Sequence, residues 1–212
     1  FALTHYWHVN HGNKLIGWAH STTRFWDLRY YFDPRIYNSN YDLNIPLPDY
    51  FAVSSETAKT AFIDAGCQIH KIKEVEALRY LHLRNNRQLN SHTKTRKNSI
   101  LILGDYLKRN TDMLMGLVDK AEELINRKNN FIVKPHPACS IYSDDYPELD
   151  LFVTNNEIHS LLDQCVLAIC SSSTSAAVDC YYAGTPVVTV LDPESLNLSP
   201  LRGNEDVIFV SS

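Results

Sequence analysis

No stretch of the 212-residue chain approaches the roughly 18 consecutive apolar residues that a membrane-spanning helix needs. The start of the sequence also lacks the charged and then apolar segments of a secretory signal. The first residue is Phe1 rather than Met, so we expect a fragment whose N-terminal portion is missing. These features favour a cytoplasmic protein.

The chain also lacks a strong charge of either sign. Its formal net charge of -4 gives no global attraction to polyanions, so no nucleic-acid partner is expected. The five cysteines are odd in number, widely spaced and mostly flanked by apolar residues, which is typical of core positions in a reduced compartment. An apolar fraction of 44% is enough to bury a core, so we expect a globular protein.

From residue 98 onward, short β-rich runs alternate with helical patterns, as in a parallel sheet covered by helices. Helices are expected after a cap at Asn110 or Thr111, at residues 158–162, and from about residue 174 to 182 with an end at Gly184. The fold class is therefore α/β. Strands are expected at residues 99–103, 131–133, 151–153, 166–169, 186–191 and 207–210.

The first part of the chain has a less regular pattern. Ser54 or Ser55 is expected to cap a helix that stops at Gly66. Residues 84–98 carry five Lys or Arg residues and no acid, so we expect an interdomain linker there. A basic run of this kind is usually a solvated loop, although beside a membrane it would also contact anionic lipid.

Lys134-Pro135-His136-Pro137 directly follows the predicted strand at residues 131–133. Ligands of parallel α/β sheets bind beyond the carboxyl ends of the strands, so a functional turn belongs here. The prolines restrict the backbone around His136. Lys134 and His136 together suit a phosphate group, and His136 suits protonation of a leaving oxygen. The alternative is a proline-braced turn with a solvent-facing His and a surface Lys.

A second polar run, residues 171–175, follows the predicted strand at 166–169 and precedes a helix. Hydroxyls and free backbone N–H groups at a helix N-terminus make an anion site, here built from Ser172, Ser173 and Thr174. The alternative is that the run only caps the helix. Taking both runs together, we expect two loops from neighbouring strands to converge on one phosphate.

Residues 179–187, Asp-Cys-Tyr-Tyr-Ala-Gly-Thr-Pro-Val, resemble the acid-Ala-x-x-x-Gly-x-Pro-Val signature of GT-B glycosyltransferases. The resemblance implies two Rossmann-like domains. Residues 99–212 would bind the nucleotide-sugar donor, and residues 1–83 would be the end of an acceptor-side domain. Asp179 stands where the family commonly has Glu, which implies contact with the donor ribose or sugar. The alternative for Asp179 is an exposed helix acid.

Within that superfamily, the His-Pro and Ser-Ser pair is similar to the motifs of bacterial sialyltransferases and Kdo transferases, which use CMP-activated acidic sugars. The similarity implies that His136 contacts the donor phosphate or cytidine and that Ser172 and Ser173 bind the phosphate. Related patterns occur in the glycerophosphotransferases of teichoic-acid synthesis, which use CDP-glycerol. The expected donor is therefore a CMP-activated acidic sugar, and the expected acceptor is a surface glycan or lipid-linked glycan. Such an acceptor implies peripheral association with the inner membrane.

Gly17-Trp18-Ala19-His20-Ser21-Thr22 resembles a turn near the end of the first GT-B domain, where a His lines the cleft and in some members serves as base. The resemblance makes His20 a catalytic candidate; the alternative is packing beside Trp18. Residues 46–53 resemble the strand approach near the end of that domain. Arg24 and Arg29 suit an acidic sugar or an acceptor phosphate. Alternatively, Asp27 pairs with one of these arginines and the nearby aromatics are core.

His5, His8 and His11 recur at a spacing of three, but no matching Cys or acid cluster accompanies them. No Asp-x-Asp pair lies in a strand-end loop, so we expect metal-independent transfer and no cofactor. The sequence is interpreted as an incomplete GT-B glycosyltransferase. Two alternatives stay open, a nucleotide-sugar epimerase of the same fold and a non-catalytic module that binds nucleotide sugars or glycans.

Overall fold

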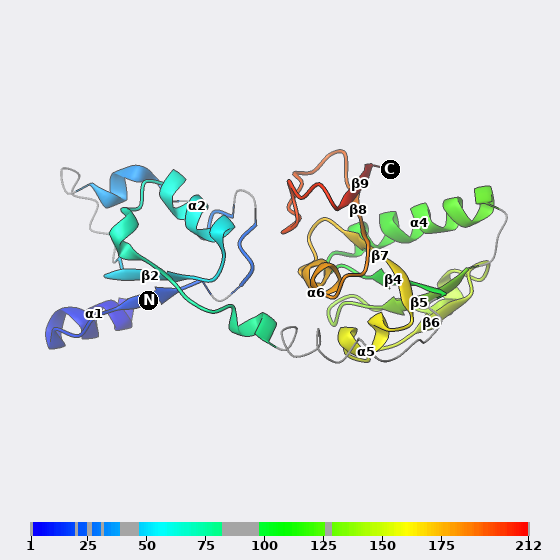
Figure 1. Cartoon of the computed structure of the whole chain (residues 1–212), viewed down its shortest axis with the longest axis horizontal. Helices are drawn as coiled ribbons and strands as arrows, with labels where there is room; N and C mark the ends of the chain where they lie inside the picture. The colour runs from blue at the N-terminus through cyan, green and yellow to red at the C-terminus, as the bar shows by residue number, and fades with distance from the viewer. Residues whose placement is uncertain are drawn as a thin grey trace. The chain divides into compact units, whose positions relative to one another are not determined.

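The chain forms two compact units, residues 1–81 and 82–212 (Figure 1). The predicted linker at residues 84–98 lies outside the described residues apart from Asn98. The computed structural model describes residues 2–19, 21–24, 27–30, 32–38, 47–81, 98–125 and 129–211.

The first unit is built on a three-stranded parallel sheet in the order β1-β2-β3. Helix α1 precedes the sheet and α2 connects β2 to β3. The elements are α1 (Ala2–His11), β1 (Ile16–Trp18), the 3-10 helix Pro34–Tyr37, β2 (Tyr50–Val53), α2 (Glu56–Asp64), the 3-10 helix Ile69–Lys71, β3 (Ile72–Glu74) and the 3-10 helix Leu78–Tyr80.

Helix α2 has the ends that its sequence predicts. The Ser55 hydroxyl accepts a hydrogen bond from Ala58 N at 3.1 Å, and Gly66 follows the helix with a φ of 92°. The buried face of α2 packs on the sheet through a cluster of apolar side chains, which comprises Phe51, Val53, Ala58, Phe62, Cys67 and Ile72.

The second unit contains six parallel strands, and a strand lies at each predicted place. β4 and β6 have the predicted ends. β5 and β7 extend beyond the predicted strands at both ends, and β9 is shifted by one residue toward the C-terminus. β8 begins after Pro186, which has no N–H to donate to a ladder. The strands are β4 (Ser99–Leu103), β5 (Asn130–Lys134), β6 (Leu151–Val153), β7 (Cys165–Ser171), β8 (Val187–Leu191) and β9 (Ile208–Ser211).

The strand order of this sheet is β6-β5-β4-β7-β8-β9. Counted along the chain, these are the third, second, first, fourth, fifth and sixth strands of the unit, which is the Rossmann arrangement. The chain moves one way from β4 and the opposite way from β7. The topological switch point therefore lies between β4 and β7, and this is where such sheets bind ligands.

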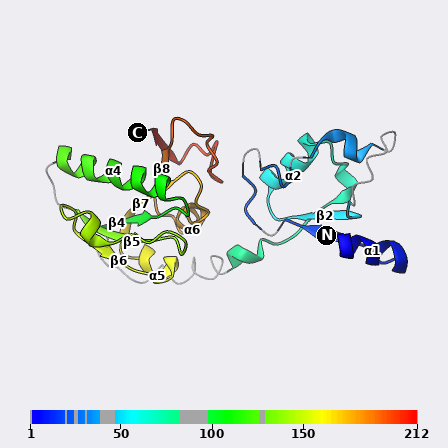
Figure 2. The same ribbon diagram turned by 180° about the vertical axis from the view of Figure 1, so that it is seen from behind.

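The helices cover both faces of the six-stranded sheet. Helix α4 (Lys108–Ile125) lies on one face, and α5 (Ile158–Leu162) and α6 (Ala176–Tyr182) lie on the other (Figures 1 and 2). Right-handed crossovers require this, because α4 and α6 lead away from the switch point in opposite directions. The core on the α4 side is formed by Ile102, Leu114, Met115, Val118, Phe131, Val133, Ile141, Leu149 and Val190.

The start of α4 differs from the sequence prediction. The helix begins at Lys108, so Asn110 and Thr111 lie inside its first turn and the prediction that one of them caps it was wrong. Their side chains instead turn back to Asp105, which precedes the helix. These residues hydrogen-bond well to local backbone, and here that capacity serves the strand-to-helix turn.

Helix α6 begins at Ala176, two residues later than expected. Ser175 occupies the N-cap position without a capping hydrogen bond from its side chain. The predicted end is confirmed, because Gly184 adopts a φ of 78° and Thr185 N donates to Cys180 O at 3.0 Å. With seven residues, α6 is a short helix.

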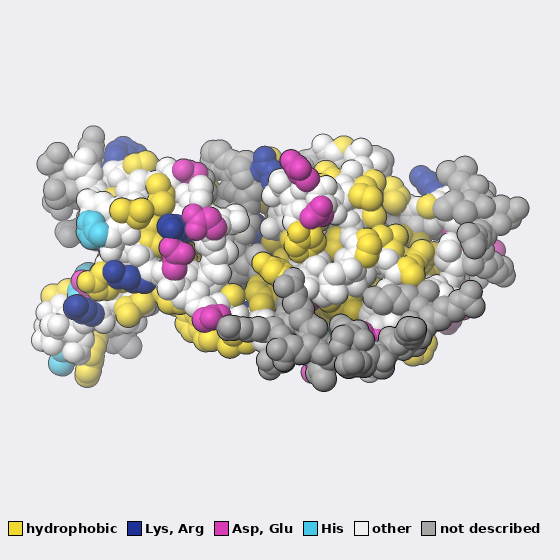
Figure 3. All heavy atoms as spheres, in the orientation of Figure 1, with side chains coloured by type: hydrophobic (Ala, Val, Ile, Leu, Met, Phe, Trp, Pro, Cys, Tyr) yellow, Lys and Arg dark blue, Asp and Glu magenta, His cyan; other side chains and the backbone are white. Residues whose placement is uncertain are grey.

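On the face drawn in Figure 3, the described Lys and Arg side chains are interspersed with those of Asp and Glu. Neither unit shows an extended basic surface among the described residues on that face. No helix in the described part of the chain has the length and apolar character needed to cross a bilayer.

Candidate functional site

The candidate site lies at the carboxyl edge of the six-stranded sheet. All six strands are parallel, so the turns that follow them emerge at one edge. The two predicted polar runs follow β5 and β7, and these strands are not neighbours, because β4 lies between them. The expectation of neighbouring strands was therefore wrong. It failed because the sequence reveals strands but not their order.

His136 is held in a tight turn after β5. Its Nδ1 accepts a hydrogen bond from Ala138 N at 3.1 Å, and its carbonyl accepts one from Cys139 N at 2.9 Å. Because a backbone N–H only donates, Nδ1 carries no proton in this arrangement, and the ring hydrogen lies on Nε2. The His136 ring also meets the Tyr106 ring edge to face, with ring centroids 6.1 Å apart. His136 thus presents Nε2–H as a donor.

Lys134 is the last residue of β5, and its ammonium contacts the loop after β6. The Nζ atom donates to the carbonyl oxygens of Asn155 at 3.3 Å and Asn156 at 2.8 Å. β6 lies on the side of β5 away from β4, so the ammonium reaches away from the switch point. Two of its three N–H groups are engaged, which leaves one for a ligand.

The three predicted hydroxyls after β7 are in different situations. Ser173 is buried and its hydroxyl donates to Asp105 Oδ2, so its single hydrogen is already used. Thr174 Oγ1 accepts from Ala176 N at 3.4 Å. Ser172 is 8% exposed, and its side chain has no hydrogen-bond partner within the described part of the chain. Thr174 accepts in its hydrogen bond, so the hydroxyl hydrogens of Ser172 and Thr174 are the two that a ligand can take up.

Asp179 lies in the first turn of α6 and is half-buried. Its backbone carbonyl accepts from Ala183 N at 3.1 Å as the helix ends. Asp179 therefore lies on the helix that follows residues 172–174 (the Ser172 turn) and leads away from the switch point.

Asp105 follows β4 and bridges the switch point. Its Oδ2 accepts from the hydroxyls of Ser171 and Ser173, both from the β7 side. The carboxylate is 1% exposed, and burial opposes its ionisation. The hydrogen bonds from Ser171, Ser173, Leu107 N and Asn110 outweigh that penalty and hold the pKa of the Asp105 carboxyl below its usual range.

Sequence reasoning missed Asp105 and the preceding Gly104. Ligands of parallel α/β sheets bind beyond the carboxyl ends of the strands, and Gly104-Asp105 directly follows a predicted strand. The same rule that led to the other two loops would therefore have indicated this one. A Cβ on Gly104 would lie 3.2 Å from His136 N and 3.3 Å from Pro135 Cα, so the turns after β4 and β5 are in close contact. This contact depends on β4 and β5 being adjacent, which the sequence did not reveal.

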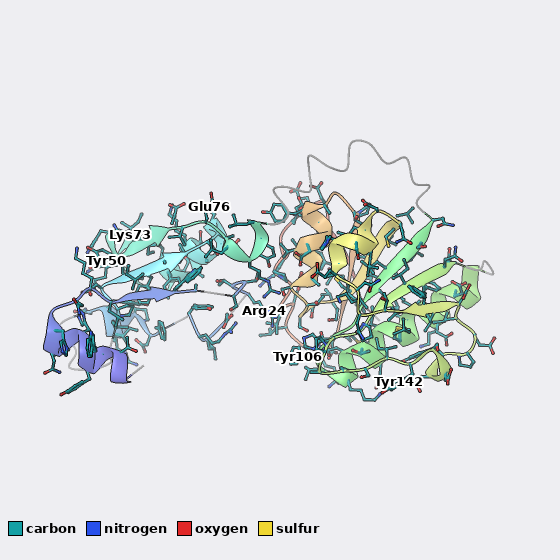
Figure 4. All side chains as sticks on the ribbon, turned by 90° about the horizontal axis from the view of Figure 1, so that it is seen from below. Arg24, Tyr50, Lys73, Glu76, Tyr106 and Tyr142 are labelled. Atoms are coloured by element: carbon teal, nitrogen blue, oxygen red, sulfur yellow. The ribbon has the colours of Figure 1, made fainter. Side chains whose placement is uncertain are left out.

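The predicted residues of the first unit lie after β1. His20 lies outside the described residues. Arg29 forms a bidentate pair with Asp27, with Nε–Oδ1 at 2.8 Å and Nη2–Oδ2 at 2.6 Å, so the alternative that Asp27 pairs with one of the arginines is confirmed. Burial opposes ionisation of Asp27, but the Arg29 contacts lower the pKa of its carboxyl. Arg24 is half-buried, and its Nε has no hydrogen-bond partner among the described residues (Figure 4).

The described residues contain no group of three His, Cys, Asp or Glu side chains arranged for a metal ion. His5 and His8 have ring centroids 6.3 Å apart, and His11 stacks on Trp7 at 3.9 Å. Their spacing thus places side chains on one helix without assembling a ligand set there.

No family model matches the chain, and no curated protein matches it in sequence. Among solved structures, it is similar to HepE from Anabaena in complex with UDP and glucose, with a TM-score of 0.54 and 12% identity over 99% of this chain and 61% of HepE. The HepE complex with UDP-glucose gives a TM-score of 0.51 and 11% identity over 99% of this chain and 62% of HepE. A UDP-N-acetylglucosamine 2-epimerase from Rickettsia bellii gives a TM-score of 0.49 and 12% identity over 66% and 42%.

The chain spans 61% of the length of HepE. The similarity extends over both units, and the sheets of both are parallel. The chain therefore has the predicted α/β fold of the GT-B type, with Rossmann-like parallel sheets.

Proposed function

We propose that the chain belongs to a glycosyltransferase that moves a sugar from a nucleotide donor to a surface-glycan acceptor. The observation that carries the proposal is the switch point between β4 and β7. The Ser172 turn and α6 leave the sheet there, and the His136 turn lies one strand away. HepE, which is similar in fold, was captured with UDP and glucose.

In this proposal the donor phosphate is held at the carboxyl edge of the second unit. Ser172 and Thr174 donate their hydroxyl hydrogens and His136 donates Nε2–H, whereas Ser173, whose hydroxyl already donates to Asp105, lines the turn. The hydrogen bond to Nδ1 fixes the His136 ring before the ligand arrives, so this donor needs little reorganisation as negative charge develops on the departing phosphate. Lys134 adds its remaining N–H from the far side of β5.

The other predicted residues take roles from the GT-B resemblance. Asp179 on α6 would bind the donor ribose or sugar. His20 would accept the proton of the acceptor hydroxyl, and Arg24 would contact an acidic sugar or acceptor phosphate. Arg29 would do so only by sharing its guanidinium with Asp27, which already occupies Nε and Nη2. His136, as a neutral donor, would stabilise the leaving phosphate.

The donor is proposed to be a CMP-activated acidic sugar, with a surface glycan or lipid-linked glycan as acceptor and transfer at the cytoplasmic face of a membrane. The His-Pro and Ser-Ser resemblance supports the cytidine base. A UDP-sugar is the first competitor, because HepE was captured with UDP and with UDP-glucose.

A nucleotide panel tests the proposal. Unfolding temperatures of the full chain are measured with CMP, CDP, UDP and GDP, since a ligand that binds only the native state raises stability by an amount set by its affinity. Affinity for the best ligand is then measured for Ser172→Ala and His136→Ala. Each loses a hydrogen bond to a charged group, about 1.5–3 kcal/mol, or roughly a 10–150-fold weaker affinity.

His70→Ala is the matched control, because His70 is an exposed residue of the first unit in the turn that enters β3. It should bind as the unmodified protein does. Unchanged affinity in both site variants would rule out the proposed phosphate site. Incubating the donor without acceptor separates the classes of function: an epimerised donor indicates an epimerase, and saturable binding without any product indicates a binding module.

A further inference from the structure

Asp105 is the centre of a hydrogen-bond network that joins three turns of the carboxyl edge. Its Oδ1 accepts from Leu107 N at 2.9 Å, and its Oδ2 accepts from Asn110 Nδ2 at 3.2 Å and from two serine hydroxyls. No Lys, Arg or His pairs with it among the described residues. A buried carboxylate without a counter-charge is costly unless donors surround it, so these donors are what keeps the charge in place.

The network continues to the turn after β5. Thr111 Oγ1 accepts from Asp105 N at 3.1 Å, donates to Asp105 O at 3.2 Å, and accepts from Cys139 Sγ at 3.8 Å. Cys139 N in turn donates to His136 O at 2.9 Å. The Thr111 hydroxyl thus uses its one hydrogen and both lone pairs. A continuous path of hydrogen bonds therefore joins Ser173 to His136 through Asp105.

We propose that Asp105 is a positioning residue of the candidate site, which sets the separation between the Ser172 turn and the His136 turn so that both contact one phosphate-containing ligand. Asp105 is assigned no contact with the ligand, because both of its carboxylate oxygens already accept hydrogen bonds and a carboxylate repels a phosphate. The proposal rests on the proposed function and adds to it the group that holds the two turns in register across β4.

The direction in which nucleotide affinity changes when the Asp105 charge is removed tests the proposal. A carboxylate close to a phosphate site repels the phosphate, so removing the charge should tighten binding if the turns stay where they are. If Asp105 positions the turns, its removal should weaken binding in spite of the relieved repulsion. Asp105→Asn keeps one acceptor oxygen for Leu107 N, but its NH₂ group faces Asn110 Nδ2 and the two serine hydroxyls would have to rotate to accept from it, so the charge-assisted bonds from the serines are lost.

The experiment uses the full chain with Asp105→Asn, Ser173→Ala, Ser173→Thr and the core variant Val118→Ala. Val118 is buried under α4 and takes no part in the network, so it matches the loss of stability alone. Amide hydrogen exchange at residues 172–174 and 136–139 is measured without ligand, and affinity for UDP and CDP is measured separately.

We expect Asp105→Asn and Ser173→Ala to speed exchange at residues 172–174 and to weaken nucleotide binding by roughly tenfold each, the equivalent of one charge-assisted hydrogen bond. Ser173→Thr keeps the hydroxyl and should restore both. Val118→Ala should change neither quantity at those residues. Should Asp105→Asn fail to fold, Ser173→Ala and Ser173→Thr carry the same comparison.

Two results would overturn the positioning role. One is tighter nucleotide binding by Asp105→Asn than by the wild type. The other is amide exchange at residues 172–174 that is no faster in Asp105→Asn than in Val118→Ala, when the two variants are compared at equal stability. A wild-type protein that binds no nucleotide would instead defeat the proposed function. The exchange measurement needs no ligand, so it still decides whether Asp105 holds the two turns.

Discussion

Gly104→Ala tests the close contact between the turns after β4 and β5. The added methyl would lie 3.2 Å from His136 N, 3.2 Å from Ile141 Cδ1 and 3.3 Å from Pro135 Cα. Two of these are backbone atoms of a proline-restricted turn and cannot rotate away. Overpacking of this kind costs about 1–3 kcal/mol. The lower entropy of the unfolded chain returns about 0.4–1 kcal/mol. From the middle of both ranges, the net loss of unfolding free energy should be about 1.3 kcal/mol.

Gly116→Ala is the matched control for that substitution. Gly116 lies inside α4, and a Cβ there would meet nothing within 4 Å. The same change of residue should therefore raise the unfolding free energy by about 0.5–1 kcal/mol, through helix propensity and unfolded-chain entropy. Guanidinium unfolding followed by circular dichroism measures both. A Gly104→Ala protein as stable as the wild type, or more stable, would refute the close contact.

Two further predictions concern stability. The lowered pKa of Asp105 means that its contribution is present above its unfolded-state pKa of about 3.9 and is lost as the pH falls through the lower folded value. Asp105→Asn should therefore lose less unfolding free energy than the wild type as the pH falls below about 4; equal slopes in acid titrations would contradict this. Ser55→Ala removes the N-cap of α2 and should cost about 1 kcal/mol in thermal unfolding, with Ser54→Ala, which is not the cap, near the wild type.

The sequence predicted where regular structure lies better than how it is assembled. β4, β6 and α5 have the ends that hydrophobic patterning suggested, because each is bounded by polar residues or by residues that break strands. The order of the strands was not predicted, since it depends on the direction of each crossover and every crossover joins similar apolar patterns. The interpretation of β5 and β7 as neighbours failed for that reason.

Individual side chains in the site were harder still to predict. Ser173 and Thr111 each carry a hydroxyl that could equally bind a ligand, cap a helix or bond to a buried acid. Which one occurs depends on Asp105, and nothing local in the sequence distinguishes that residue from an ordinary loop acid. Its burial follows from the position of β4 in the middle of the sheet, with β5 on one side and β7 on the other.

The position of β4 also bears on the length of the ligand. Neighbouring strands lie about 4.8 Å apart, so the ends of β5 and β7 are separated by roughly 9.6 Å. A ligand held by both Ser172 and His136 has to bridge the part of that gap that their side chains leave, because the Asp105 carboxylate already accepts hydrogen bonds from the protein. A diphosphate, with two phosphoryl groups in series, spans such a gap better than a single phosphate does. In the nucleotide panel, tighter binding of CDP than of CMP would therefore indicate that the two turns hold one diphosphate, and it would favour a diphosphate donor such as a UDP-sugar over the proposed CMP-sugar. Equal affinities would mean that the second phosphoryl group makes no contact, as the proposed CMP-sugar requires.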